Sequence, residues 1–378
     1  MLMLAVVLAI FVYGMIASTL GTILPDLSER FSLTPKQNGN IAFAQAIGLV
    51  LASLAVGPLL DAEGKKVGLV LGLALISIAL AALPRSPGYK RILPLFFLLG
   101  IGGGIVITGA NALASDVSGA HRASVLNLVN LFFGLGGFVT PFISANLFGK
   151  NWVRLCYAIA GFTVITLVFE IATKMPGPTG AHSFIAGDMG QVLGRPVILL
   201  LGLLLFLYVS CEVGVWNWLP RHLIAQGIPE SRALNILSLG FALGLLGGRF
   251  LASTILLRVP AVTVTLVASI AMAITTFLML KTRRPAVALI LVGLAGLSMA
   301  PVFPTALAIV GNVSPRMTGT AIGFAITCGW AGLAVSSRVI GAIAGGDPLR
   351  LRKALMVIPA SAVLMVVLSL AIRAALHV

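Results

Sequence analysis

Residues 207–220 read LYVSCEVGVWNWLP and close an apolar run that begins near Pro196. The run is long enough to cross the roughly 30 Å hydrocarbon core of a bilayer. It carries an ionisable carboxyl group, Glu212, followed by Trp216 and Asn217. A carboxylate inside a membrane helix costs about 3 kcal/mol or more, so it normally faces a partner or a water-filled cavity. The stretch therefore predicts that Glu212 marks the centre of a solute pathway.

Composition predicts an integral membrane protein. The mean hydropathy is +1.11, and of the 378 residues 59% are hydrophobic and 9% charged, which is far from a soluble globule. The chain divides into apolar blocks of about 20 residues or more, the length of a membrane-spanning helix. Pro25 is expected to end the first block. We count twelve blocks: 2–24, 38–60, 67–84, 92–115, 123–148, 152–173, 196–220, 232–256, 260–280, 286–311, 318–343 and 353–376.

The net charge of +15 does not indicate a nucleic-acid partner, because the basic residues stand singly or in pairs at the ends of the apolar blocks. Such residues anchor helices at the lipid headgroups. The three cysteines have no CxxC spacing, and the four histidines lie in turns or at the terminus. We therefore expect neither a metal site nor a cofactor. Enzyme motifs such as HExxH or a P-loop do not occur, and the sequence predicts no catalytic function.

Residues 57–66 read GPLLDAEGKK and predict a turn between the second and third spans, bounded by glycines and ending in a basic pair. The turn resembles the loop between helices 2 and 3 of the major facilitator superfamily. In that family the loop is a cytoplasmic conformational latch, and Ala62 stands where the family usually has arginine. Five residues match the pattern: Gly57, Asp61, Gly64, Lys65 and Lys66.

Two further stretches resemble the fucose permease branch of that superfamily, the sugar–proton symporters. Residues 126–136 read LNLVNLFFGLG, and residues 296–305 read GLSMAPVFPT. The resemblance puts Asn130 where the branch has a sugar-contacting amide, whereas Phe133 replaces a second asparagine. Two prolines three residues apart free backbone groups in a membrane helix, so we expect the tenth span to be kinked.

Several side chains within the spans are candidates for binding a sugar-like substrate. Amides and hydroxyls would bind its hydroxyl groups, and the indole rings of Trp216 and Trp330 would stack on its apolar face. The alternative is that the polar groups join helices by hydrogen bonds and that the rings only pack. The polar candidates are Tyr13, Gln45, Asn111, Asn127, Asn130, Asn217, Thr305 and Thr327.

Glu212 is the candidate coupling group, because the other nine acids are predicted at helix ends or in loops. Burial favours the neutral form of a carboxyl, as proton coupling requires. Bound sodium is the competing use of the same carboxylate, and a hydrogen bond to a neighbouring helix is the structural alternative. The fucose permease branch often has a glutamate here in helix 7, together with acids in helices 1 and 4. Those two spans contain no acid here, so coupling rests on Glu212 or is absent.

The organisation predicted is two six-helix halves, 1–174 and 196–378, joined by a cytoplasmic linker at 175–195. The halves repeat weakly at an offset of about 196 residues, since Gly48-x3-Ala52 aligns with Gly244-x3-Gly248. Transporters built from two such bundles work by alternating access. We assign Arg249, at the end of the eighth span, to the latch.

The function predicted is secondary transport of a sugar or similar polar molecule by a monomer. A drug or lipid exporter is the alternative within the superfamily, and a non-transporting receptor the alternative outside it. We expect a multi-pass protein of a bacterial inner membrane with both termini in the cytoplasm. That topology puts more basic residues outside than inside, against the positive-inside rule.

Overall fold

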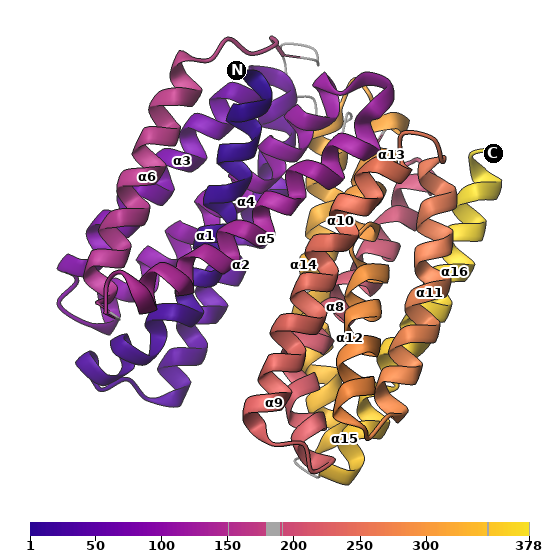
Figure 1. The fold of residues 1–378 in the computed structure, drawn as a ribbon. Helices are drawn as coiled ribbons and strands as arrows, with labels where there is room; N and C mark the ends of the chain where they lie inside the picture. Colours follow the sequence, from indigo (N-terminus) through magenta and orange to yellow (C-terminus); the bar gives the residue numbers. More distant parts are fainter. Residues whose placement is uncertain (150, 179–189, 191, 346–347, 378) are drawn as a thin grey trace. The chain divides into compact units, whose positions relative to one another are not determined.

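The computed structural model describes residues 1–149, 151–178, 190, 192–345 and 348–377, and every regular element among them is a helix (Figure 1). Twelve helices are long and apolar enough to cross a membrane. The twelve predicted spans are thereby confirmed. Of the predicted linker, residues 179–189 and 191 lie outside the described part of the chain.

The first half of the chain forms six long helices. Two short 3-10 turns, η1 (Leu83–Arg85) and η2 (Gly119–His121), lie beside α3 and α5. The long helices are α1 (Leu2–Phe31), α2 (Pro35–Glu63), α3 (Lys65–Ala82), α4 (Tyr89–Val117), α5 (Arg122–Asn146) and α6 (Trp152–Ala172).

The second half contains more interruptions. One of its elements, η3 (Ile236–Ala242), is a π-helix that continues α9 into α10. The α-helices are α8 (Pro196–Ala225), α9 (Glu230–Asn235), α10 (Leu243–Ile255), α11 (Ala261–Lys281), α12 (Pro285–Met299), α13 (Val302–Val313), α14 (Thr318–Ala344), α15 (Pro348–Leu355) and α16 (Val357–Ala375).

The chain forms two compact units, and two helices contribute to both. Unit 1 comprises Met1–Val117, Val129–Val192 and Ser314–Thr327. Unit 2 comprises Ser118–Leu128, Leu193–Val313 and Cys328–Val378. The start of α14 thus packs in unit 1 and the start of α5 in unit 2. The two exchanged segments begin at Ser118 and Ser314, which are separated by the same offset of about 196 residues that the sequence predicts.

Prolines interrupt the helices less often than expected. The first helix continues through Pro25 and ends where Ser32 adopts a left-handed backbone with φ 48°, so the predicted end at Pro25 is wrong. The second helix likewise continues through Pro58, and the turn begins only at Gly64, with φ 93°. A proline removes one backbone hydrogen bond, and membrane helices tolerate that loss when neighbouring helices support them. The tenth span, for which a kink is predicted, is interrupted at the prolines, because α12 ends at Met299 and α13 begins at Val302.

Small residues let α2 and α4 approach closely in unit 1. A Cβ atom added at Gly100 would lie 2.1 Å from the carbonyl oxygen of Gln45, and one at Gly48 would lie 2.3 Å from that of Phe97. A Cβ atom added at Gly104 would likewise lie 2.5 Å from the carbonyl oxygen of Leu49. Without a hydrophobic driving force between helices in lipid, such close packing holds membrane bundles together.

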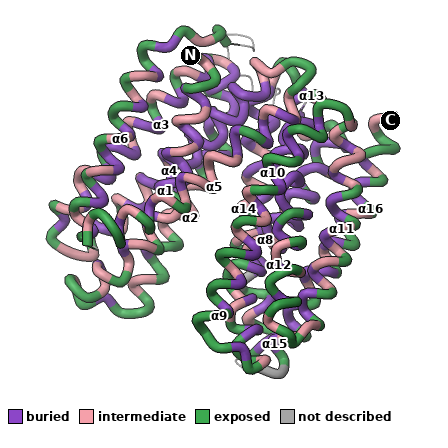
Figure 2. The backbone as a smooth tube through the Cα atoms, viewed as in Figure 1, coloured by how far each residue is buried: buried purple, intermediate pink, exposed green. Residues whose placement is uncertain are grey.

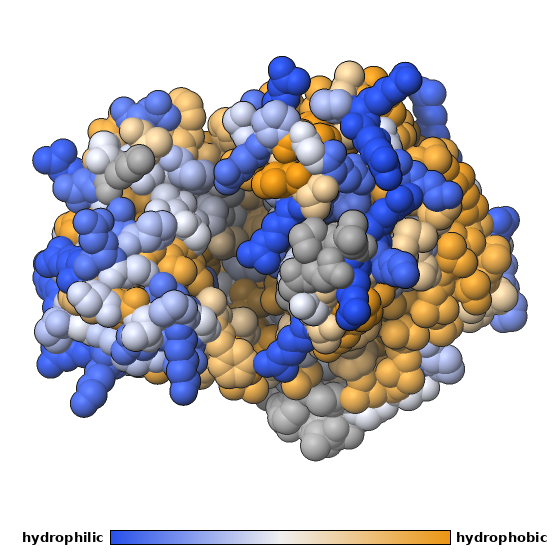
Figure 3. Space-filling model, turned by 90° about the horizontal axis from the view of Figure 1, so that it is seen from below, coloured by the Kyte–Doolittle hydropathy of each residue, from blue (hydrophilic) through white to orange (hydrophobic). Residues whose placement is uncertain are grey.

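Burial follows the expectation for a protein in lipid. Buried residues line the inside of each unit, and exposed ones lie on its outer faces (Figure 2). The outer faces are apolar, as at Ile165 of α6 and Val267 of α11, which are 66% and 59% exposed. Seen from one end, many hydrophilic residues gather on the surface that faces the viewer, and a broad hydrophobic area extends along part of the edge (Figure 3).

The close approach of α2 and α4 makes a testable prediction. Gly100→Ala places a methyl group against the Gln45 carbonyl, and we expect overpacking to cost about 1–3 kcal/mol. Gly161→Ala in α6 is the matched control, since nothing lies within 4 Å of its added Cβ. That change should be neutral or stabilise the helix by up to about 1 kcal/mol. Thermal unfolding in detergent checks both, and equal midpoints for the two variants would contradict the packing described.

Candidate functional site

Glu212 lies in the middle of α8, on one face with residues one turn before and after it. Tyr208 is fully buried, Glu212 is half-buried, and Trp216 is 38% exposed. Tyr208 packs beside Phe303 of α13, with ring centroids 6.3 Å apart, and Trp216 meets Phe241 of η3 edge-on at 5.3 Å. The face therefore passes from the core of unit 2 to its surface, with a carboxyl group between two aromatic rings.

A buried arginine belongs to the same group of residues. Arg249 of α10 is 5% exposed, and its charge, like that of Glu212, acts on the Tyr208 hydroxyl. The Tyr208 hydroxyl is fully buried. A carboxylate and a guanidinium near one phenol form a site in which loss or gain of one charge changes the field at the others.

The remaining candidates on this side of the chain flank α8. Asn217 is exposed and Trp330 of α14 is half-buried, and the Trp330 indole nitrogen has no hydrogen-bond partner among the described residues. The helices α8 and α14 are joined directly. Ser210 donates to the carbonyl oxygen of Gly332 at 3.1 Å, and Ser336 donates to that of Ser210 at 2.6 Å. These bonds hold the segment that carries Trp330 against the turn before Glu212.

In unit 1 the structure brings two predicted amides together. The side-chain nitrogen of Asn130 donates to the side-chain oxygen of Asn111 at 2.8 Å, and Asn111 donates to the carbonyl oxygen of Ile107. Both residues are buried. Tyr13 of α1 stacks on Phe133 of α5, with ring centroids 5.4 Å apart, and its ring lies beside Gly103 of α4. Both amides are thus bonded to other groups of the protein. The ring of Phe133 stands where the fucose permease pattern has a second asparagine.

The other polar candidates are separate from this pair. Asn127 belongs to unit 2, where it donates to Thr305 at 3.0 Å, and both side chains are fully buried. Gln45 is half-buried in α2. The hydroxyl of Thr327, also half-buried, donates to the carbonyl oxygen of Gly323 in its own helix at 2.8 Å.

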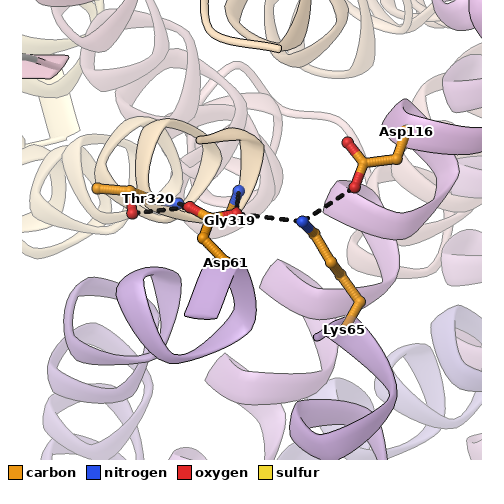
Figure 4. Close-up of polar contacts among 5 residues, drawn as sticks. All are labelled: Asp61, Lys65, Asp116, Gly319 and Thr320. Atoms are coloured by element: carbon orange, nitrogen blue, oxygen red, sulfur yellow. Dashed lines mark hydrogen bonds and ion pairs between the residues drawn. The ribbon is translucent and has the colours of Figure 1, made fainter. Parts of the chain in front are cut away.

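Two of the residues predicted to form the latch, Asp61 and Lys65, belong to a connected network in unit 1 (Figure 4). One carboxylate oxygen of Asp61 accepts from the backbone nitrogen of Gly319 at 2.8 Å. The other accepts from the backbone nitrogen and the hydroxyl of Thr320, both at 2.8 Å. The Lys65 ammonium lies 3.1 Å from Asp61 and 3.0 Å from Asp116 of α4. Asp61 thus caps the first turn of α14, where free backbone N–H groups and the helix dipole favour an anion.

Close backbone approach makes this cap possible. A Cβ atom at Gly57 would lie 2.6 Å from the carbonyl oxygen of Gly319, so any larger residue would push α14 away from α2. Lys66 does not join the network around Asp61. It donates instead to the carbonyl oxygens of Ile171 and Thr173 at 2.6 and 3.0 Å. Arg249, which the sequence analysis assigned to the latch, belongs to unit 2.

Sequence reasoning missed the partners of the latch. Asp116, Gly319 and Thr320 follow no motif that marks them, and only the offset of about 196 residues gives a signal. Under that offset Thr320 corresponds to Ser124, whose hydroxyl donates to the carbonyl oxygen of Ser253 at 2.5 Å in unit 2. Arg122 donates to Asn312 in the same unit. Ser124 therefore binds a backbone carbonyl oxygen, while Thr320, the residue that corresponds to it, binds the carboxylate of Asp61.

The network around Asp61 predicts an order of destabilisation. Asp61→Ala leaves the α14 amides without an acceptor and breaks a buried ion pair, which costs about 3–5 kcal/mol. Thr320→Val removes one hydroxyl donor and should cost about 1 kcal/mol. The exposed acid of the same turn, Glu63, provides the control, because Glu63→Ala should be neutral. Thermal unfolding midpoints should fall in that order, and an Asp61→Ala protein as stable as Glu63→Ala would refute the cap.

Comparison with known proteins now assigns the family. The model of the Major Facilitator Superfamily matches residues 6–337. The chain therefore belongs to this superfamily of membrane transporters. The glucose/mannose transporter GlcP of Bacillus subtilis is 26% identical over 352 residues, which cover 88% of this chain and 85% of GlcP. The niacin transporter NiaP of Acinetobacter baylyi is 26% identical over 253 residues, which cover 57% of this chain and 56% of NiaP.

The chain covers about half of the length of several curated relatives that it matches. Among solved structures, the E. coli fucose:proton symporter FucP superposes with a TM-score of 0.85 at 18% identity, over 98% of each chain. A structural similarity at 18% sequence identity establishes the fold alone. The chain thus has the major facilitator fold, and its resemblance to the fucose permease branch is confirmed at that level.

Proposed function

We propose that the chain is a secondary active transporter of a sugar or similar polar molecule, coupled to a proton or sodium ion through Glu212. The observation that carries the proposal is the face of α8, where Glu212 lies half-buried between Tyr208 and Trp216. An ionisable group at this depth is expensive and is normally retained for ion or substrate movement. GlcP and FucP, whose names state sugar transport, support the substrate class.

Each group on this face has a proposed role. Glu212 takes up the coupling ion, and the ring of Trp216 packs against the apolar face of a sugar. Arg249 balances the charge of Glu212 when the coupling ion leaves, which lowers the cost of the ionised state inside the unit. The buried amides Asn111 and Asn130 serve as substrate ligands only after their mutual hydrogen bond opens. Gln45, Asn127, Asn217, Thr305, Thr327, Trp330 and Tyr13 remain proposed substrate contacts.

The proposed cycle is alternating access between the halves 1–174 and 196–378, with both termini cytoplasmic. Asp61 and Lys65 form the latch that one state makes and the other breaks. Binding of the coupling ion and the substrate supplies the free energy for the exchange, since a ligand shifts an equilibrium only by its differential affinity for the two states.

Glu212→Gln tests the coupling role, because the amide keeps the size of the side chain but cannot ionise. We expect gradient-driven accumulation of substrate in proteoliposomes to be lost, while exchange of internal for external substrate continues. Glu230→Gln, which changes an exposed acid at the start of α9, should leave accumulation unchanged. Normal accumulation by Glu212→Gln would remove Glu212 from the mechanism.

A panel of labelled substrates tests the substrate class on the wild-type protein. Hexoses should compete for uptake, whereas nicotinate and 4-hydroxybenzoate should not. NiaP and the 4-hydroxybenzoate transporter PcaK of Pseudomonas aeruginosa are relatives named for such aromatic acids. Uptake of an aromatic acid without uptake of any hexose would overturn the sugar assignment and leave the fold and the coupling role standing.

A further inference from the structure

A second carboxyl group is more deeply buried than Glu212 and has no assigned role. Glu170 lies two residues before the end of α6 and is 0% exposed. Both of its carboxyl oxygens are buried, and neither has a hydrogen-bond partner among the described residues. Native proteins seldom leave buried polar atoms unpaired, so an unpaired buried carboxyl requires an explanation.

A charge that acts on Glu170 belongs to the turn between α2 and α3. The ammonium group of Lys66 acts electrostatically on Glu170 but donates its hydrogen bonds to two neighbouring carbonyl oxygens, those of Ile171 and Thr173. A cation at the carboxyl end of a helix is stabilised by the helix dipole and by the free carbonyl groups there. Lys66 therefore holds the end of α6 through its backbone, although a carboxyl group stands beside it.

Among the described residues, the charged groups on the elements packed against α6 bind other partners or lie elsewhere, and Lys174, four residues after Glu170, is exposed. The helix α6 packs against α3, α1 and η1. From α3, Lys65 is bound to Asp61 and Asp116. From η1, Arg85 donates to the carbonyl oxygen of Ala81. From α1, residues 2–25 contain no ionisable side chain except that of Tyr13, the acids and the arginine of this helix lie at its far end from Asp26 onward, and the amino group of Met1 belongs to a residue that is 87% exposed.

An ionised carboxylate without hydrogen bonds is costly in a medium of low dielectric, and such a group takes up a proton instead. We propose that Glu170 is a proton-binding site whose deprotonation releases the hold of Lys66 on the end of α6. The proton passes from the carboxyl oxygen to water. The carboxylate left behind then draws the Lys66 ammonium from the carbonyl oxygens of Ile171 and Thr173, because a charge-assisted hydrogen bond is about twice as strong as a neutral one.

The consequence is a second control point on the turn between α2 and α3. Lys65 ties this turn to the latch acids, and Lys66 ties it to α6. Whether Glu170 is protonated decides whether Lys66 donates its hydrogen bonds to the end of α6. The inference does not rest on the proposed substrate or on Glu212, which belongs to unit 2. Failure of either proposal would leave the other intact.

Infrared spectroscopy of the reconstituted protein tests the proton site directly. At neutral pH the wild-type protein should show the carbonyl stretch of a protonated carboxylic acid, and the difference spectrum against Glu170→Gln should contain this band. Glu63→Gln, which alters the exposed acid of the same turn, should leave the band unchanged. A difference spectrum that contains only carboxylate bands would show that Glu170 is ionised and would overturn the proposal.

Hydrogen exchange tests the release of Lys66. In the wild-type protein, exchange at residues 169–175, corrected for its intrinsic pH dependence, should rise when Glu170 loses its proton. Glu170→Gln should remain protected throughout, and Lys66→Met should exchange rapidly at every pH. If exchange in the Glu170→Gln protein rises with pH as it does in the wild-type protein, Glu170 does not control the release of Lys66, and the proposal is contradicted. If Glu170→Gln does not fold, the comparison of wild type with Lys66→Met decides, since a step common to both cannot come from Lys66.

Discussion

The constraint on which this structure depends is the cost of a charge where water is absent. Asp61 satisfies it completely, because its two oxygens accept three hydrogen bonds from the start of α14 and one ion pair from Lys65. Glu212 satisfies it in part, because it is only half-buried, and both Glu212 and Arg249 act on Tyr208. Glu170 does not satisfy it, since neither oxygen has a partner among the described residues. The three carboxyl groups thus differ in how firmly each is held in one state.

These differences match different tasks. A carboxylate that caps a helix and pairs with lysine holds two segments together until a competing free energy separates them. A carboxyl that is only partly compensated can gain and lose a proton or cation at low cost. The counterpart of the Asp61 cap in unit 2 uses Ser124 and Ser253 instead. Corresponding helix starts of the two repeats thus bind different groups: Ser124 binds a backbone carbonyl oxygen and Thr320 binds the carboxylate of Asp61.

The sequence predicts the fold well because hydropathy and length decide which segments span a bilayer. The twelve spans and the break near Pro301 follow from it. The helix end predicted at Pro25 and the start of the turn predicted at Gly57 were wrong, because a proline removes only one hydrogen bond and packing against neighbouring helices outweighs that loss. A proline pair beside Gly296 and Ala300 interrupts the helix, whereas single prolines do not.

The site was less predictable, because its partners come from segments distant in sequence. Asn130 was recognised from a motif, but its bond to Asn111 depends on how α4 and α5 pack. Thr320 and Asp116 follow no motif, and only the crossing of helices places them at Asp61 and Lys65. Glu170 was counted as an acid at a helix end, which its position in the sequence supports. Its complete burial against α3 and α1 becomes visible only in the folded chain.

The central claim is that the transporter converts an ion gradient into accumulation of a polar substrate. The most direct measurement is the steady-state accumulation of labelled hexoses in proteoliposomes that contain the wild-type protein, with pH and sodium gradients imposed separately. The account predicts that one of the two gradients drives a hexose above its external concentration and that collapse of this gradient releases it. Equal internal and external concentrations under both gradients would contradict the account.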